Sequence, residues 1–161
     1  MGDSCGHAHA GGHGLTGSGL GEALSEAEAR CAALGERLTP PRRRVLELLL
    51  QAGQPTKAYD LIAAFGTDGQ AAKPPTVYRA LEFLERIGMA HRISSISAYV
   101  ACVKGDAAHA AAFLICDCCG DAREIESPSG DALRSGAASA GYRLDRVTIE
   151  AHGLCGACLS A

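Results

Sequence analysis

The sequence predicts an α+β protein made of two small units. Segments with helical spacing of apolar residues fill residues 24–84, and short runs typical of β-strands follow Gly88. Two Cys-x-x-Cys pairs in the second half predict a metal that holds the second unit together. A chain of 161 residues can form one ordinary domain or two small ones with modest cores.

The first two helices are recognised by apolar spacing and by signals at their ends. Residues 24–34 place Cys31 on the apolar stripe as a small buried side chain, and Gly35 is suited to end the helix. The next helix has Thr39 as its cap, a proline pair in its first turn and Gly53 as its stop.

Three consecutive arginines, Arg42, Arg43 and Arg44, crowd the first turn of this second helix. Cations are disfavoured there, because the helix dipole is positive at the N-terminal end. The placement predicts phosphate contacts for Arg42, Arg43 and Arg44, with a solvated polar face as the alternative.

A third helix is predicted over residues 57–65, with Thr56 as its cap and Tyr59 close to its start. The stretch of residues 73–84 then reads as a recognition helix. Its proline pair cannot continue an upstream helix, and Thr76 is a suitable N-cap.

The polar face of residues 73–84 carries the side chains suited to reading DNA. Val77, Leu81 and Leu84 form the apolar face, so Tyr78 and Arg79 point outward near the N-terminal end. An arginine there can bond two guanine acceptors at once. An ordinary amphipathic helix with a solvated face is the alternative.

Two short β-type runs, residues 91–93 and 99–103, follow the helices and predict a hairpin. Helix-turn-helix plus hairpin makes a winged helix. The second unit reads as strands at 112–116 and 122–125, a helix near 131–140, and a strand at 143–151 before a Cys-rich tail. It has few large apolar residues, so it needs a metal, a partner subunit, or both.

The expected domains are a disordered Gly/His-rich head (1–19), a winged-helix DNA-binding domain (20–103), a hinge linker (104–110) and a zinc-stapled dimerisation domain (111–161). Residues 30–92 carry ten Lys/Arg against six Asp/Glu, a surplus of four, although the net charge is −3. This basic middle favours a polyanion that meets one domain.

No run approaches the ~18 apolar residues of a membrane helix, and no secretory signal is visible. Eight cysteines without such a signal indicate metal or redox chemistry in a reducing compartment. We therefore expect a cytoplasmic protein that contacts no membrane.

The strongest chemical signal is the pair of Cys-x-x-Cys turns, which can present four thiolates tetrahedrally to Zn²⁺. A redox Cys-x-x-Cys is the main rival, but it needs no second pair. Cys118 is a surplus thiol inside the first turn. The predicted structural zinc ligands are Cys116, Cys119, Cys155 and Cys158.

A second set of ligands is scattered along the chain: His91 and Cys102 in the wing, His109 in the linker and Glu124 beyond the first cysteine turn. Together they offer N, S, N and O ligands that suit a four-coordinate zinc. His152 is a further candidate, as a residue behind the ligands or an unrelated one.

Several motifs, in order from about residue 20 to the C-terminus, resemble the ferric-uptake-regulator (Fur) family, and most closely its zinc-uptake-regulator (Zur) branch. They are Thr39-Pro-Pro-Arg42, Ala58-Tyr59-Asp60-Leu61, Lys73-Pro-Pro-Thr-Val-Tyr-Arg-Ala-Leu81, Ile115-Cys-Asp-Cys-Cys-Gly120 and Glu150-Ala-His-Gly-Leu-Cys155-x-x-Cys158.

The resemblance implies a dimeric bacterial repressor with two zincs per subunit: a structural one at the four cysteines, and a regulatory one at the second set. It places Tyr59 and Arg79 where the family reads bases. The homodimer is expected to bind palindromic double-stranded DNA operators, with uptake genes as targets. The full set of expected DNA-contacting residues is Tyr59, Lys73, Thr76, Tyr78, Arg79, Arg42 and Arg43.

Three alternatives remain. An iron-, manganese- or peroxide-sensing regulator is disfavoured because the family's His-His-Asp-His run is absent, and a thiolate in the sensor site favours zinc. A zinc-storage or metallochaperone protein would explain the His-rich head but not Tyr59 and Arg79. A zinc hydrolase would need an open coordination position and a general base, and the sequence shows no such pattern, so we expect no enzyme and no catalytic residue.

Overall fold

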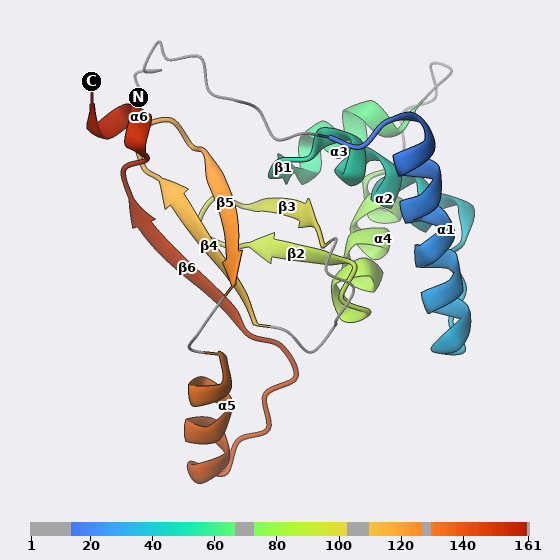
Figure 1. Cartoon of the computed structure of the whole chain (residues 1–161). Coiled ribbons are helices and arrows are strands. Elements are labelled where there is room, and N and C mark those ends of the chain that lie inside the picture. The colour runs from blue at the N-terminus through green and yellow to red at the C-terminus, as the bar shows by residue number, and fades with distance from the viewer. Residues whose placement is uncertain (1–13, 67–72, 103–109, 127–129, 161) are drawn as a thin grey trace. The chain divides into compact units, whose positions relative to one another are not determined.

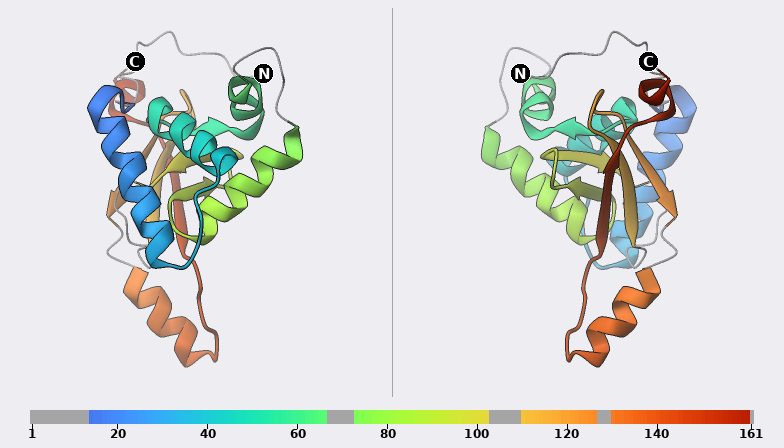
Figure 2. Two further views of the ribbon diagram at one scale, coloured as in Figure 1. Left: turned by 90° about the vertical axis from the view of Figure 1, so that its right-hand side faces the viewer. Right: turned by 90° about the vertical axis from the view of Figure 1, so that its left-hand side faces the viewer.

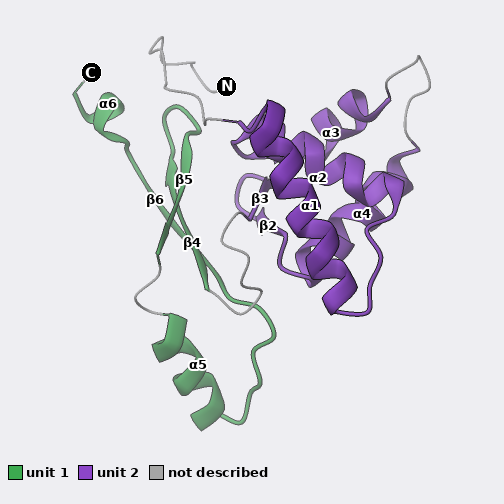
Figure 3. Cartoon of the chain, turned by 45° about the vertical axis from the view of Figure 1, so that its right-hand side comes forward, with its two compact units in different colours: residues 1–10, 108–161 green, residues 11–107 purple. Residues whose placement is uncertain are grey.

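The structure is a computed structural model, which describes residues 14–66, 73–102, 110–126 and 130–160 (Figure 1). The chain divides into two compact units (Figure 3). Of the described residues, 14–102 form one and 110–160 the other. Each unit has its own three-stranded sheet. No helix of the described segments is long and apolar enough to cross a membrane.

The first unit packs four helices around one apolar core. They are α1 (Gly17–Ala33), α2 (Pro40–Ala52), α3 (Ala58–Phe65) and α4 (Pro74–Arg86). Each contributes the face that its apolar spacing predicts, and Cys31 is 1% exposed in the core, as expected for a small apolar residue. The largest fully buried side chains of these helices are Leu49, Leu61, Leu81, Leu84, Val45 and Val77.

The helix ends agree with the sequence in α2 and differ elsewhere. Thr39 is the N-cap residue of α2, and Gly53 ends it with a φ of 59°, a left-handed conformation that glycine adopts without strain. In contrast, α4 begins at Pro74 with Lys73 as its N-cap residue, three residues before the predicted N-cap Thr76. Prolines fit the first helical positions because their fixed φ is helical and their missing N–H would have no partner there. Similarly, α1 begins at Gly17, inside the segment expected to be disordered.

A small sheet completes this unit. It contains β1 (Thr56–Lys57), β2 (Ala90–Ile93) and β3 (Ala98–Ala101) in the order β1-β3-β2, with both pairings antiparallel. The predicted wing hairpin is therefore present as β2 and β3. Thr56 was wrongly predicted as a helix cap, because its backbone pairs with Tyr99 of β3 and α3 starts only after Lys57.

The second unit is built on the central strand β4 (Ala111–Cys116). It pairs antiparallel with β5 (Ala122–Glu126) and parallel with β6 (Thr148–Gly153). The last strand was predicted to start at residue 143, but pairing begins where Ala111, the first residue of β4, meets Thr148. Just before it, the Val147 carbonyl accepts a hydrogen bond from the Ala111 N–H at 3.2 Å, and residues 143–146 pair with no strand that the structure describes.

The helices of the second unit cover little of its sheet. Figures 1 and 2 show α5 (Gly130–Ser139) beyond the end of the sheet, and only Gly130 of this helix is buried. The short α6 (Gly156–Leu159) follows β6 and has no buried residue. Most of the apolar burial in this unit lies on β4, including Phe113 and Ile115.

Candidate metal and nucleic-acid sites

Four thiols meet at one end of the second unit. Cys116 ends β4, Cys119 lies in the turn to β5, Cys155 is the N-cap residue of α6 and Cys158 lies within that helix. Their sulfur atoms all lie within 4.8 Å of one another. The Cys119 and Cys155 Sγ atoms are 3.8 Å apart. A tetrahedral zinc with Zn–S bonds of ~2.3 Å would separate its sulfurs by about 3.8 Å. The four thiols therefore fit zinc.

The parallel pairing of β4 with β6 closes the long gap between the two cysteine pairs. Cys116 lies opposite Gly153, and the Asp117 N–H donates to the Gly153 carbonyl at 2.8 Å. The first pair is held by a tight turn, in which the Gly120 N–H donates to the Cys116 carbonyl at 2.9 Å. Gly120 has a φ of 76°, a conformation in which a side chain would be strained.

Backbone N–H groups prepare Cys116 to bind a cation. Hydrogen bonds from the backbone of Cys119 and Cys155 lower the pKa of the Cys116 thiol to about 6. One of these is the Cys155 N–H at 3.3 Å from the Cys116 sulfur. Burial and the neighbouring thiols raise the pKa of Cys158. The lowered pKa suits Cys116 to bind a metal cation as a thiolate, and the charge of the cation would favour the thiolate form of Cys158 as well.

Two other polar residues lie beside the cluster without being among its four sulfurs: Cys118, whose side chain hydrogen-bonds to Cys158, and His152. Cys118 is exposed, while His152 places its Nδ1 atom 2.8 Å from the Asp117 carboxylate. This contact ties β6 to the turn after β4. His152 thereby steadies the cysteine turn from outside the ligand set.

The surplus thiol gives a direct test of the ligand assignment. We expect Cys118→Ser to retain the metal content and melting temperature of the wild type, because the four clustered sulfurs already satisfy a tetrahedral ion. Metal analysis of the dialysed variant by mass spectrometry measures this. Loss of zinc would show that Cys118 replaces one of the four as a ligand.

The second ligand set is divided between the units. Cys102 follows β3, and its N–H donates to the Met89 carbonyl at 2.9 Å. Cys102 therefore lies opposite Met89, and His91, two residues further along β2, shares its face of the wing. Cys102 is 7% exposed. Glu124 lies on β5 of the other unit, with its Oε1 atom buried, and His109 lies outside the described residues.

The helix-turn-helix exposes the side chains that were expected to read DNA. Tyr59, in the first turn of α3, is 79% exposed, and Tyr78 of α4 is 46% exposed. Arg79 and Lys73 are exposed and make no hydrogen bond or ion pair with any residue that the structure describes. Thr76 is half-buried, with its N–H bonded to the Lys73 carbonyl. The N-terminal half of α4 thus presents the exposed ring of Tyr78 and the Arg79 cation, which has no partner among the described residues, while α3 presents the exposed ring of Tyr59.

The two other expected DNA contacts behave differently. Arg42 donates a hydrogen bond from its guanidinium to the Arg37 carbonyl at 2.7 Å. Arg43 pairs with Glu28 of α1 at 2.9 Å. Both cations therefore already have partners within the unit, unlike Arg79.

Comparison with known proteins identifies the family. The model of the Ferric uptake regulator family matches residues 33–152, which is most of the chain. The chain belongs to the ferric uptake regulator family. Its family relatives include the zinc uptake regulation protein of Escherichia coli (strain K12), which is 43% identical over 141 residues, covering 86% of this chain and 82% of that protein.

Two solved structures of the family resemble this chain closely. One is a zinc uptake regulator complexed with zinc and DNA, at a TM-score of 0.78 and 41% identity over 88% of this chain and 95% of that one. The other is the crystal structure of holo XcZur, at a TM-score of 0.74 and 41% identity over 86% and 97% of the two chains. The winged helix followed by a small α/β unit is therefore the family fold.

Proposed function

We propose that this chain is a zinc-responsive transcriptional repressor that binds palindromic DNA operators as a homodimer and controls zinc-uptake genes. The observation that carries the proposal is the presence, in one chain, of a helix-turn-helix with an exposed Arg79 that has no partner among the described residues, and of a cluster of four thiols. The chain also shares its fold, at 41% identity, with a zinc uptake regulator bound to zinc and DNA.

The four clustered cysteines would hold a structural zinc, which supplies folding energy to a unit with little core of its own. Four thiolates leave no coordination position open, so the site suits a structural ion and not catalysis. The sheet already aligns both cysteine pairs, and this lowers the ordering cost of binding.

The second unit also has the surface expected of a dimerisation domain. Several large apolar side chains of this unit remain exposed, and α5 packs against neither face of the sheet. A second copy of the unit would remove this surface from water. The side chains concerned are Leu114, Ile125, Leu133, Tyr142, Leu154 and Leu159.

His91, Cys102, His109 and Glu124 would form the regulatory site. Ligands from the wing, the linker and β5 restrict the orientation of the DNA-binding unit only when all are engaged by one ion. Zinc would then stabilise the arrangement in which both recognition helices meet successive half-sites, which is a linkage between metal and DNA binding. The mixed nitrogen, sulfur and oxygen set with a thiolate favours zinc over iron or manganese.

A mobility-shift assay tests the proposed function. A duplex selected by the protein from a random pool in the presence of zinc should be retarded, and a zinc chelator should release it. Re-addition of zinc, but not of manganese, should restore the complex. Retardation that is unchanged by chelation would contradict the proposal.

Arg79 should carry base readout. We expect Arg79→Ala to weaken operator binding by ~1–3 kcal/mol per subunit and to relax preference at one base pair of each half-site. Competition with single-substitution duplexes measures both effects. Lys57→Ala is a matched control, since Lys57 is an exposed cation of the same unit that precedes α3. An Arg79→Ala protein with wild-type affinity and selectivity would exclude this docking geometry.

A further inference from the structure

The three arginines of α2 each reach a different helix of the first unit. Arg42 lies against Phe83 of α4, Arg43 pairs with Glu28 of α1, and Arg44 donates to the Ala64 carbonyl of α3 at 3.3 Å. Arg44 also pairs with Glu47 within α2. The first turn of α2 therefore contacts α1, α3 and α4. The positive charge of its arginines, which is unfavourable at a helix N-terminus, is offset by carboxylates and carbonyl groups of the protein itself.

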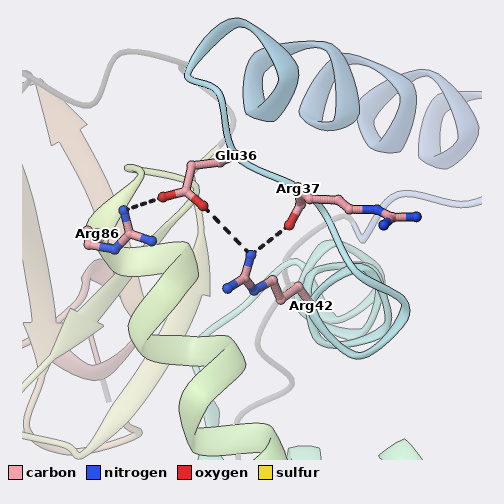
Figure 4. A network of polar contacts seen from close by, with 4 residues as sticks. All are labelled: Glu36, Arg37, Arg42 and Arg86. Atoms are coloured by element: carbon pink, nitrogen blue, oxygen red, sulfur yellow. Dashed lines mark hydrogen bonds and ion pairs between the residues drawn. The ribbon is translucent and has the colours of Figure 1, made fainter.

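Arg42 has the most specific surroundings of the three. Its guanidinium carbon lies 3.4 Å from the centre of the Phe83 ring, which is the separation of stacked planes. The same group donates to the Arg37 carbonyl at 2.7 Å and lies 4.0 Å from Glu36 (Figure 4). Only a flat cation with several N–H donors can stack and donate at the same time, so lysine cannot replace it.

Glu36 extends this contact to the end of α4. One of its carboxylate oxygens accepts a hydrogen bond from Arg86 at 2.8 Å, while the other faces Arg42 (Figure 4). The Arg86 guanidinium carbon is also 5.2 Å from the Phe83 ring. We call Glu36, Arg42, Phe83 and Arg86 the α4 anchor. It joins the segment after α1 and the start of α2 to the C-terminal half of α4.

The anchor acts on the same helix that presents Arg79. Phe83 is one helical turn after Arg79, and Arg86 is about one turn further. Phe83 is 3% exposed, so this residue cannot contact a nucleic acid. A change in how Phe83 is held would tilt or shift α4 and so displace Arg79 from a base edge, where small displacements are costly.

We propose that Arg42 is a positioning residue for the recognition helix and not a phosphate contact. This inference rests on the proposed DNA-binding function. It assigns to Arg42 a role that differs from the phosphate contact expected from its place in the sequence. Arg43, which is 43% exposed and has a single ion-pair partner, remains the candidate for phosphate contact in this turn.

The test compares charge-conserving and charge-removing variants on one operator. Arg42→Lys keeps the charge but loses the stack, so we expect it to weaken operator binding about tenfold, as much as Arg42→Gln does. Both variants should also lose sequence selectivity, which is measured as a smaller ratio of the affinity for the operator to the affinity for single-substitution duplexes. The slope of log affinity against log salt should stay at the wild-type value, whereas Arg43→Gln should reduce it by about 0.9 per subunit.

A double-mutant cycle gives the test its specificity. Phe83→Leu keeps an apolar side chain but removes the ring, so it should reproduce the Arg42→Lys defect, and the double variant should be no worse than either single one. If Arg42→Lys binds as the wild type does and Arg42→Gln reduces the salt slope, then Arg42 contacts phosphate and the proposal is wrong. Additive losses in the double variant would overturn it as well.

A measurement without DNA separates this inference from the proposed function. Amide hydrogen exchange of the free protein should be about tenfold faster in the C-terminal turn of α4 in Arg42→Lys, while α3, which Arg44 contacts, keeps its wild-type rates. Unchanged exchange rates in α4 would contradict the proposal that Arg42 holds this helix, even if the protein binds DNA. Faster exchange in a protein that binds no operator would refute the proposed function and leave the anchor in place.

Discussion

Cys158→Ser should leave the second unit largely unfolded and the protein monomeric. The described core of this unit is confined mostly to β4, so zinc is expected to provide much of its stability. Zinc binding contributes about 10–16 kcal/mol to the folding of zinc-finger peptides, and three thiolates hold the ion far less well than four. Cys119→Ser should behave in the same way, because the Cys119 sulfur belongs to the same cluster.

Light scattering after gel filtration and the near-ultraviolet circular dichroism spectrum report the two effects of Cys158→Ser. Cys118→Ser is the matched control, since it removes a thiol from the turn that contains Cys119 but not one of the four clustered sulfurs. A soluble, dimeric Cys158→Ser protein with an unchanged melting temperature would show that the four thiols are not a structural metal site. The first unit, with its own helical core, should remain folded in this variant.

Cys102→Ser should abolish zinc-dependent DNA binding without unfolding either unit. Cys102 follows β3 at the end of the wing and is not part of the helical core of its unit, and serine is nearly the same size. The variant should remain dimeric and keep the zinc of the four-cysteine cluster. Wild type should hold two zincs per subunit, of which mild chelation releases only the one in the mixed-ligand site.

Metal analysis after mild chelation, with operator binding measured on the same samples, tests this second prediction. Cys118→Ser serves as a control, because it makes the same substitution at a thiol outside both ligand sets. One zinc per subunit in active wild type would eliminate the regulatory site. The same conclusion would follow from a Cys102→Ser protein whose operator binding still tracks free zinc.

The sequence predicts most of this fold because its signals are local. The Thr39 and Gly53 boundaries of α2, the buried stripe containing Cys31 and the wing strands all depend on residues within a few positions of one another. The predictions for Thr56 and for the start of β6 were wrong for one reason. Both segments are defined by pairing with a strand that lies far away in the chain. Thr56 pairs with Tyr99 of β3, and β6 begins where it meets Ala111 of β4.

The candidate sites also differ in whether their signals are local in the sequence. The four cysteines could be predicted because two Cys-x-x-Cys turns have few other uses together, although the sheet pairing that unites them is not visible in the spacing. The α4 anchor could not be predicted, because Glu36, Phe83 and Arg86 show no pattern that links them to Arg42. The sequence therefore predicted phosphate contacts for the arginine cluster, and in the structure all three arginines lie within 4.0 Å of a carboxylate of the protein.

The β4–β6 pairing makes the four-cysteine cluster a cross-link between distant parts of the chain. A metal bound there would close a loop between Cys119 and Cys155, which are 36 positions apart, with α5 inside it. The entropy lost on closing a loop grows only slowly, by about 0.6 kcal/mol for each doubling of its length. The connection around Gly141, between α5 and β6, is exposed and belongs to neither sheet nor cluster. This loop could therefore change in length during evolution, and with it the reach of α5, while the metal site and its sheet stay intact.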